Sequence, residues 1–259
     1  MRTQKYPTDV TDDQWQLIAP LLPKAKPGGR PRSVNLREVL NGILYVVRGG
    51  VPWRMLPHDL PPWGTVHYYY RRWRLDGTWA KVLDVLRTRL RHADGRTKSP
   101  SAAVVDTQTV RTASGGEKGY DAGKRTPGRK RHIIVDTMGL LLAVVVHSAS
   151  VQDRDGVKRV GERIKGRFPR LKLIWADAAY EAAVGWAKQF GNWVLELVRK
   201  APGQKGFVVQ KRRWVVERTF AWLMRCRRLA RDYERLTESS EAMVQVAAIH
   251  LMLKRLKPA

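Results

Sequence analysis

Three acidic residues lie where a metal-dependent nuclease needs them. Asp106 and Asp177 each end an apolar run typical of a buried strand, and Glu217 lies in a segment with helical character. Carboxylates on two strands and one helix can converge on two Mg²⁺ or Mn²⁺ ions, which stabilise both the attacking and the leaving oxygen in phosphoryl transfer. These residues therefore predict cutting and joining of a phosphodiester chain, with the three carboxylates as catalytic groups and metal ligands.

The charge of the chain points to a polyanionic partner. The 259 residues contain 49 Lys and Arg against 23 Asp and Glu, a net charge of +26. This excess is far larger than solubility requires. Composition alone leaves open DNA, RNA bound in the manner of a ribosomal protein, and a merely solvated cationic surface.

Other site classes are disfavoured by composition. A single cysteine, Cys226, can form neither an internal disulfide nor a multi-cysteine zinc site, and the histidines show no ligand spacing. No apolar run approaches the roughly 20 residues of a membrane span. The N-terminus lacks the apolar core of a signal peptide, so we expect a cytoplasmic protein without a membrane partner.

Residues 1–95 predict a small helical domain. Thr11 and Gln14 form a capping-box pattern before one helix, and Asn35 caps a second helix that ends at Gly49. Two further helices are expected over 63–74 and 78–91. Short helices with a basic, aromatic third member resemble a helix-turn-helix module.

Residues 92–100 are polar and aperiodic, and they predict a boundary before a second domain over 101–259. Strand and helix patterns then alternate in the order of the ribonuclease H-like fold, an α/β fold with a mixed sheet and helices on both faces. The strands are expected at 102–106, 132–136, 141–147, 171–177 and 193–199 and the helices at 155–165, 181–190 and from near Lys211.

Other acidic residues compete with the proposed three. Asp136 also follows an apolar run, but in this strand order it lies at the far edge from Asp106, and we interpret it as a turn residue beside Gly139. Asp153 and Asp155 precede a helix and are interpreted as caps or first-turn charges.

Six stretches of the second domain resemble the DDE transposases of the insertion-sequence-five family of bacteria. The similarity also extends to the N-terminal segments 21–23 and 49–54, and so covers nearly the whole chain. The six stretches are 104–110, 119–124, 128–132, 151–156, 175–180 and 213–220.

The resemblance implies a metal-bound triad of Asp106, Asp177 and Glu217. It also implies double-stranded DNA partners, namely terminal inverted repeats and target DNA, and a homodimer in a synaptic complex at the bacterial nucleoid. Water would attack the phosphodiester first, and the freed 3′-hydroxyl would then attack the target. Two alternatives are a DNA-binding repressor derived from a transposase and a nuclease of the same fold. An intact triad argues against the repressor, and a helical recognition domain argues against the simple nuclease.

Around Glu217 the family pattern places a tyrosine, an arginine and a lysine at fixed spacings. Arg213 fits as a phosphate-binding residue four positions before Glu217, whereas the tyrosine position is Gln210 and the lysine position is Met224. Arginines that follow Met224 can supply the missing cation. Further DNA contacts are expected from a flexible basic loop over 115–131, from the face of the third helix opposite its apolar stripe, and from an Arg-Pro arm. The expected DNA-binding residues are Arg213, Arg225, Arg228, Lys124, Arg129, Lys130, Arg71, Arg72, Arg30 and Arg32.

Overall fold

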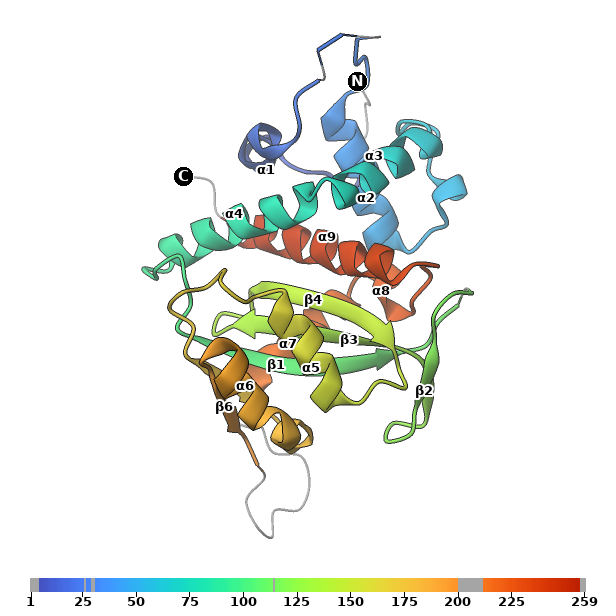
Figure 1. The fold of residues 1–259 in the computed structure, drawn as a ribbon. Helices are drawn as coiled ribbons and strands as arrows, with labels where there is room; N and C mark the ends of the chain where they lie inside the picture. The colour runs from blue at the N-terminus through green and yellow to red at the C-terminus, as the bar shows by residue number, and fades with distance from the viewer. Residues whose placement is uncertain (1–4, 26, 29–30, 114, 200–211, 257–259) are drawn as a thin grey trace.

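The computed structural model describes residues 5–25, 27–28, 31–113, 115–199 and 212–256. Arg30, Gln210 and Lys211 therefore lie outside the described residues. Within the described ranges the chain forms a mixed sheet with helices on both faces, preceded by an all-helical N-terminal region (Figure 1). Both features agree with the prediction from the sequence.

Two of the N-terminal helices begin at the capping residues that the sequence predicts. Thr11 accepts a hydrogen bond from the Gln14 amide, and the Gln14 side chain accepts one from the Thr11 amide, which completes the capping box. The Asn35 side chain caps the second helix, and Gly50 ends that helix with a left-handed φ of 76°. The four helices are α1 (Asp12–Ile18), α2 (Leu36–Gly49), α3 (Trp63–Leu75) and α4 (Thr78–Ala93), with short 3₁₀ turns at Ala19–Leu21 and Trp53–Met55.

Six strands make up the sheet. The central strand has an antiparallel neighbour on one side and a parallel neighbour on the other. β1 pairs antiparallel with β3 and parallel with β5; β3 pairs antiparallel with β4, and β5 parallel with β6. The spatial order is therefore β4-β3-β1-β5-β6, with β2 paired to the start of β3. The strands are β1 (Ala102–Val110), β2 (Gly119–Asp121), β3 (Thr126–Asp136), β4 (Leu141–Ser148), β5 (Leu173–Ala176) and β6 (Val194–Leu197).

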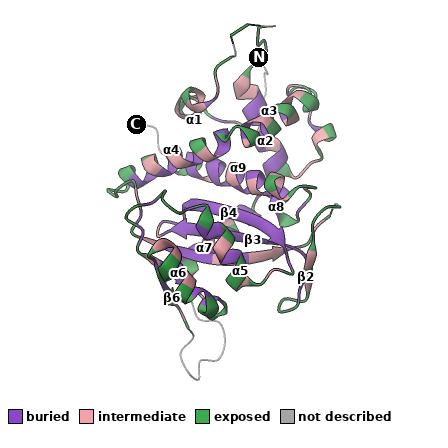
Figure 2. Ribbon diagram, in the orientation of Figure 1, coloured by how far each residue is buried: buried purple, intermediate pink, exposed green. Residues whose placement is uncertain are grey.

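Helices cover the two faces of the sheet unequally. α5 (Asp153–Glu162) and α6 (Val184–Gly191) pack on one face, and α6 follows the 3₁₀ turn Ala178–Ala183. The other face carries α4, α7 (Trp214–Met224) and the long α9 (Thr237–Arg255), with the short α8 (Arg227–Ala230) between the last two. The strands β3 and β4 are buried between these layers (Figure 2). None of the described helices has the length and apolar character needed to cross a membrane.

A single hydrophobic core joins the N-terminal helices to the sheet. It runs from Leu40 of α2 through Trp79 of α4 and Ile249 of α9 to Val104 of β1. α9 supplies the link, because it contacts α2, α4 and β4. The segments 1–95 and 101–259 therefore share one core and are not separated by a break in packing.

Two expectations about this sheet are wrong. The first strand does not end at Asp106, because Thr107 to Val110 continue to pair with β3, so Asp106 lies in the middle of β1. The segment 115–131 is not one flexible loop either, because its last residues form the start of β3. In both cases a polar stretch continues a strand through pairing with a distant segment, which no local pattern reveals.

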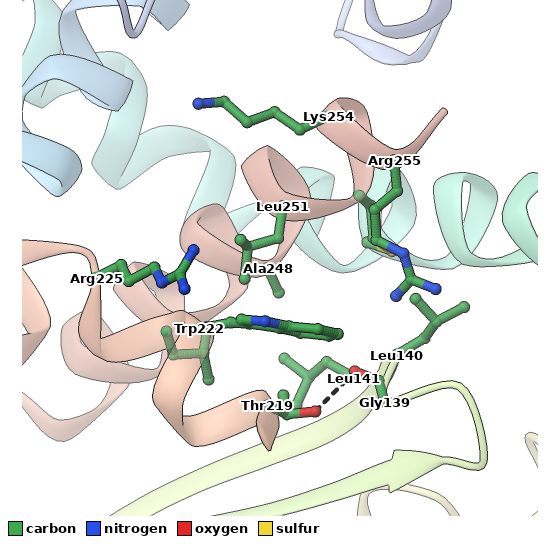
Figure 3. A pocket seen from close by; sticks show the side chains of 12 residues that line it. Gly139, Leu140, Leu141, Thr219, Trp222, Arg225, Ala248, Leu251, Lys254 and Arg255 are labelled. Carbon is green, nitrogen blue, oxygen red and sulfur yellow. Dashed lines mark hydrogen bonds between the residues drawn. The ribbon is translucent and has the colours of Figure 1, made fainter. Parts of the chain in front are cut away.

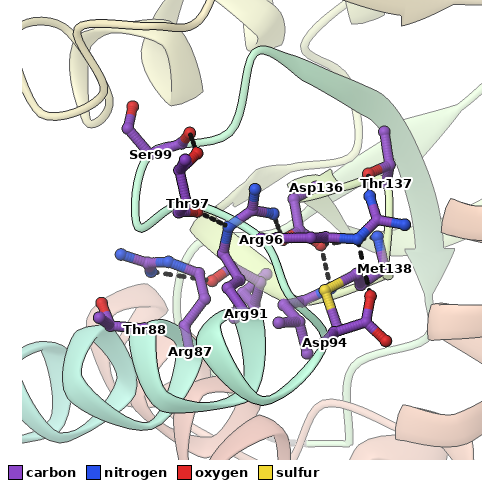
Figure 4. A network of polar contacts seen from close by, with 12 residues as sticks. Arg87, Thr88, Arg91, Asp94, Arg96, Thr97, Ser99, Asp136, Thr137 and Met138 are labelled. Carbon is purple, nitrogen blue, oxygen red and sulfur yellow. Dashed lines mark hydrogen bonds and ion pairs between the residues drawn. The ribbon is translucent and has the colours of Figure 1, made fainter.

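Asp136 ends β3 and serves the fold, as the sequence predicted for a turn residue. Its carboxylate accepts hydrogen bonds from the amides of Met138 and Leu140 at 2.9 Å and so shapes the turn into β4. The same carboxylate forms a fully buried ion pair with Arg91 of α4 (Figure 4). Asp136 thereby ties the last N-terminal helix to the sheet at the end of β1 away from Asp106.

Candidate active site

The register of the sheet places the two aspartates side by side. In the parallel pair of β1 and β5, Ala102 lies opposite Leu173 and Val104 lies opposite Trp175. Continuing this register past the end of β5 brings Asp177 level with Asp106. Side chains alternate along a strand, so Asp106 points to the same face as Val104, the face that α7 covers.

Each aspartate accepts a backbone hydrogen bond with one carboxylate oxygen, and its other oxygen faces Arg213. Asp106 Oδ1 accepts the amide of Thr107 at 2.7 Å, and Asp177 Oδ1 accepts the amide of Ala179 at 2.9 Å as the cap of the following 3₁₀ turn. The second oxygens, Asp106 Oδ2 and Asp177 Oδ2, both approach Arg213. The backbone therefore orients both carboxylates before any ligand arrives.

Arg213 occupies the centre. Its Nη2 lies 3.3 Å from Asp106 Oδ2, 3.7 Å from Asp177 Oδ2 and 3.7 Å from Glu217 Oε1. Arg213 precedes α7 directly and Glu217 follows one turn later, so the helix brings both residues to the sheet together. The structure thus gathers the three predicted carboxylates around the predicted phosphate-binding arginine.

The three carboxylates differ in solvent exposure, and the difference shows from which side a substrate can approach the site. The side chain of Asp106 is 15% exposed, that of Asp177 31% and that of Glu217 41%. Burial raises the pKa of Asp106 to about 6, although Arg213 and the Thr107 amide both lower it. Asp106 thus forms the inner wall, and a polyanionic substrate would approach past Glu217.

The carboxylates suit a divalent metal by chemistry, and Arg213 stands between them. Mg²⁺ and Mn²⁺ bind carboxylate oxygens, and three such groups face one point here. Within the described ranges, however, no three acidic, histidine or cysteine side chains are grouped closely enough to hold an ion unaided. A metal would have to displace the guanidinium from these oxygens. The three carboxylates therefore fit a divalent metal ion by their chemistry, and Arg213 is the side chain that must move to admit it.

A buried chain of hydrogen bonds lies behind the two aspartates, on the α5 side of the sheet. The Tyr180 hydroxyl is 2.9 Å from His132 Nε2, and His132 Nδ1 is 3.0 Å from His147 Nε2. His147 Nδ1 lies 2.9 Å from the carbonyl oxygen of Ser148. Thr107, the neighbour of Asp106, lies opposite His132 in the pairing of β1 with β3. The chain therefore links the segments that carry Asp106 and Asp177.

The terminal carbonyl fixes the direction of every hydrogen bond in this chain. A carbonyl only accepts, so His147 Nδ1 carries a proton and His147 Nε2 accepts one from His132 Nδ1. His132 Nε2 then accepts the proton of the Tyr180 hydroxyl. Burial lowers the pKa of His132 well below its ordinary value and raises that of Tyr180 well above its own, which keeps both groups neutral.

These histidines were assigned no role from the sequence, which shows no ligand spacing. Once the β3 and β4 register is known, however, the pairing becomes visible: His132 lies opposite Val145, and His147 is two residues further along the same face. Gly156 of α5 covers both rings, and a Cβ there would overlap them. Once the strand pairing is known, a glycine on the neighbouring helix that faces two histidines of one hairpin indicates that the two rings meet.

The structure separates the expected DNA-binding arginines and lysines into buried and exposed sets. Arg129 and Lys130 lie in β3 and are buried; Arg129 pairs with Asp232 at 3.3 Å, and Lys130 with Asp153 at 2.8 Å. Their place in a phosphate-tracking loop is therefore corrected, because buried acidic partners hold them in the sheet. Asp153, in the first turn of α5, behaves as predicted for a first-turn charge.

The remaining cations are mostly exposed. Arg228 is buried against Glu234 at 2.8 Å, so it is unavailable as the extra cation near Met224, whereas Arg225 is exposed. Lys124 is exposed, with its Nζ 3.3 Å from the carbonyl oxygen of Thr107 next to the triad. Of the DNA-binding cations expected in the N-terminal region, Arg32 and Arg71 are exposed and Arg72 is half-buried.

Comparison with known proteins gives independent evidence about the family of this chain. Residues 97–252 match the family model of the transposase DDE domain. Residues 10–83 match a model assigned to transposases of the IS4/5 family.

Individual relatives come from insertion elements and rhizobial sequences. The chain is 35% identical over 115 residues to the insertion element IS402 16.2 kDa protein of Burkholderia cepacia, covering 42% of this chain and 77% of that protein. It is 28% identical over 127 residues to a protein assigned as the transposase of IS402 from the same species, covering 46% of this chain and 60% of that protein. It is also 36% identical over 77 residues to protein y4sN of Sinorhizobium fredii, covering 30% of this chain and 62% of that protein.

Proposed function

The chain belongs to the DDE-domain transposases of insertion elements, and we propose that it binds the terminal inverted repeats of its element and catalyses metal-dependent strand cleavage and strand transfer. The observation that supports this most is the convergence of Asp106, Asp177 and Glu217 on one cation, Arg213. Three carboxylates from a strand, a strand end and a helix form a site that needs positive charge and is open to a polyanion.

Asp106, Asp177 and Glu217 would hold two Mg²⁺ or Mn²⁺ ions, which when bound stabilise the attacking and the leaving oxygen of the phosphodiester. The amides of Thr107 and Ala179 keep one oxygen of each aspartate fixed. The chain from Tyr180 through His132 to His147 holds the backbone behind them without adding charge. These residues act by holding the two aspartates in position.

Arg213 has two roles in this proposal. In the protein alone its guanidinium neutralises three carboxylates that would otherwise repel one another. With DNA bound, the guanidinium turns to a phosphate oxygen, an acceptor that arginine can bind with two N–H groups. The Arg213 Nε is buried without a hydrogen-bond partner among the described residues, and turning the side chain towards DNA would let it donate to a phosphate oxygen.

We also propose that the sheet region is a ribonuclease H-like domain over 101–259. The order β4-β3-β1-β5-β6, with β3 antiparallel to its neighbours, supports this assignment. Residues 1–95 would then be a helix-turn-helix-like module that recognises the terminal repeats, with Arg71 and Arg72 on α3 as contacts. A homodimer would bring two DNA ends together in a synaptic complex.

The test is direct. The protein is incubated with linear DNA carrying candidate element ends, with Mg²⁺ or Mn²⁺, and the strand breaks are mapped to the nucleotide. Breaks at the element ends and joining to a second DNA support the proposal. Binding to the ends without breaks would instead favour a DNA-binding repressor, and breaks without regard to the ends would favour a simple nuclease.

A further inference from the structure

We propose that a pocket between α7 and α9 binds one unpaired nucleotide of the DNA, with its base against Trp222 and its phosphate at Arg225. This inference rests on the proposed function, since it requires that the protein handle DNA. It adds a second binding site on the helix that carries Glu217.

The pocket has the size and the walls for a flat aromatic ring. Its cavity of about 200 Å³ is smaller than the roughly 300–1,000 Å³ of sites for drug-sized ligands, so a single ring system suits it. The indole of the half-buried Trp222 forms one wall, and aliphatic side chains of α9 and the β3–β4 turn face it (Figure 3). These aliphatic residues are Leu140, Leu141, Ala248, Leu251 and Met252.

The rim of the pocket is cationic. Arg225, Lys254 and Arg255 line it, and no acidic residue does. Arg225 and Lys254 are exposed, and within the described ranges neither side chain has a hydrogen-bond or ion-pair partner in the protein. In Figure 3 the Arg225 guanidinium lies over the pocket near Trp222. An apolar wall beside unpartnered cations matches a nucleobase joined to its phosphate, and it does not match a neutral apolar ligand.

Arginines also hold the indole in place. The guanidinium of Arg218 lies 4.3 Å from the ring of Trp214 and 4.4 Å from the ring of Trp222, so these residues form a ladder along one side of α7. Arg255 lies 5.7 Å from the Trp222 ring. These contacts hold the Trp222 ring in one orientation and place positive charges around the position that a stacked base would occupy. Proteins that bind single-stranded nucleic acid combine aromatic platforms and positive charge in the same way.

The pocket shares α7 with Glu217 but lies on another side of that helix. Trp222 follows Glu217 by five residues, a rise of about 7.5 Å and a turn of about 140° around the helix axis. The pocket is therefore a second place of contact with the DNA, separate from the carboxylates. A base in the pocket would leave its complement, so the ligand is a nucleotide without a pairing partner.

The experiment compares two labelled duplexes that differ by one unpaired nucleotide at one end. Fluorescence anisotropy measures the affinity of the full-length protein for each, without metal so that no cleavage occurs. Stacking on one aromatic side chain is worth roughly fivefold to 150-fold in affinity by alanine substitution. We expect the duplex with the unpaired nucleotide to bind at least fivefold tighter, and Trp222→Ala to abolish that preference. Trp222→Phe should retain most of it.

Matched variants and a crosslink complete the test. Arg225→Gln should weaken the preference, whereas Arg89→Gln, an exposed arginine on α4 outside the pocket, should not. In the unmodified protein, 5-iododeoxyuridine at the unpaired position should crosslink to the peptide that contains Trp222, a result that does not depend on any variant folding. Equal affinity for both duplexes with crosslinks elsewhere would overturn the pocket assignment while leaving the proposed function intact. If the protein bound neither duplex, both proposals would fail.

Discussion

The guanidinium Nη2 of Arg213 lies 3.3 Å from Oδ2 of Asp106, on the face of the sheet that carries the candidate active site. This ion pair joins the start of α7 to the middle strand and brings Glu217 to the same point as Asp177. A single arginine therefore assembles the three carboxylates and at the same time occupies the position that metal ions would need.

Replacing any one of the three carboxylates is expected to stop the chemistry while leaving DNA binding. Asp106→Asn, Asp177→Asn and Glu217→Gln should each lower the cleavage rate more than about a hundredfold, since even outer residues around metal ligands contribute roughly 10–100-fold. DNA affinity, measured by gel shift, should be retained because removing negative charge does not weaken binding to a polyanion. Asp155→Asn, an exposed carboxylate on α5, is the matched control and should cut normally. Cleavage at the normal rate by Asp106→Asn would contradict the assignment.

Removing the Arg213 guanidinium is expected to separate metal binding from catalysis. Arg213→Ala should bind Mn²⁺ about tenfold or more tightly in calorimetry without DNA, because the competing positive charge between the carboxylates is gone. The same variant should cleave DNA more slowly, since the phosphate contact is lost. Arg213→Lys keeps the charge and should leave Mn²⁺ affinity closer to that of the unmodified protein. Unchanged Mn²⁺ affinity in Arg213→Ala would show that the arginine and the metal do not share these oxygens.

Asp136 is expected to matter for stability. Asp136→Asn leaves Arg91 as a buried charge without its partner, and breaking a buried ion pair on one side costs about 3–5 kcal/mol. Chemical denaturation should show a loss of this size. Asp94→Asn removes an exposed ion pair with Arg96 nearby and should change stability by less than about 1 kcal/mol. Equal small effects would mean that the network in Figure 4 does not hold α4 to the sheet.

The neutral state of His132 predicts a pH dependence of stability. Burial lowers the pKa of His132 in the folded protein below that of the unfolded chain, so the unfolded state takes up a proton first as the pH falls. The contribution of His132 to the free energy of unfolding should therefore decrease as the pH drops below about 6.5, by up to about 1.4 kcal/mol per pH unit. The raised pKa of Asp106 contributes in the opposite direction. His132→Asn should flatten that slope in urea titrations between pH 6.5 and 5, relative to the unmodified protein.

His147 and His250 contribute in the same direction, since burial lowers the pKa of each, that of His250 to about 4. Part of the slope will therefore remain in His132→Asn. Gln16→Asn replaces an exposed residue of α1 that does not titrate, and this control should leave the slope unchanged. An unaltered slope in His132→Asn would mean that this histidine does not titrate differently in the two states.

Recognition of the element ends is expected to depend on α3. Arg71→Ala together with Arg72→Ala should reduce the preference for the element ends over random DNA, measured by competition binding at moderate salt, where non-specific phosphate contacts are weakened. Arg154→Ala, an exposed arginine on α5, should not change that preference. A preference that survives the double substitution would place recognition outside α3.

Much of the fold could be predicted because its signals are local. The capping residues Thr11 and Asn35 mark two helix starts, and the apolar runs before Asp106 and Asp177 mark two neighbouring strands. Once those strands pair in parallel, the register alone brings the two carboxylates level. Arg213 and Glu217 share a helix face through their spacing of four. The residue types and the spacing thus determined the candidate groups, and the strand pairing brought them together.

Other features depend on contacts between residues far apart in the chain, and only the tertiary structure decided them. Arg129 and Lys130 appear as free cations in the sequence, yet Asp232 and Asp153 pair with them inside the protein. The long helix expected from near Lys211 ends at Met224, and the separate helix α9 links the N-terminal helices to the sheet.

The histidine chain and the position of Arg213 follow the same rule. His132 and His147 meet because two strands pair and a glycine on α5 leaves room for both rings. Arg213 reaches Asp106 across 107 positions of sequence. The sequence by itself determined the charge, the capped starts of two helices and the set of candidate carboxylates, because these depend on residue types and on neighbours within a few residues. Burial and partner choice depend on which distant surfaces pack together, and these only the folded chain decides.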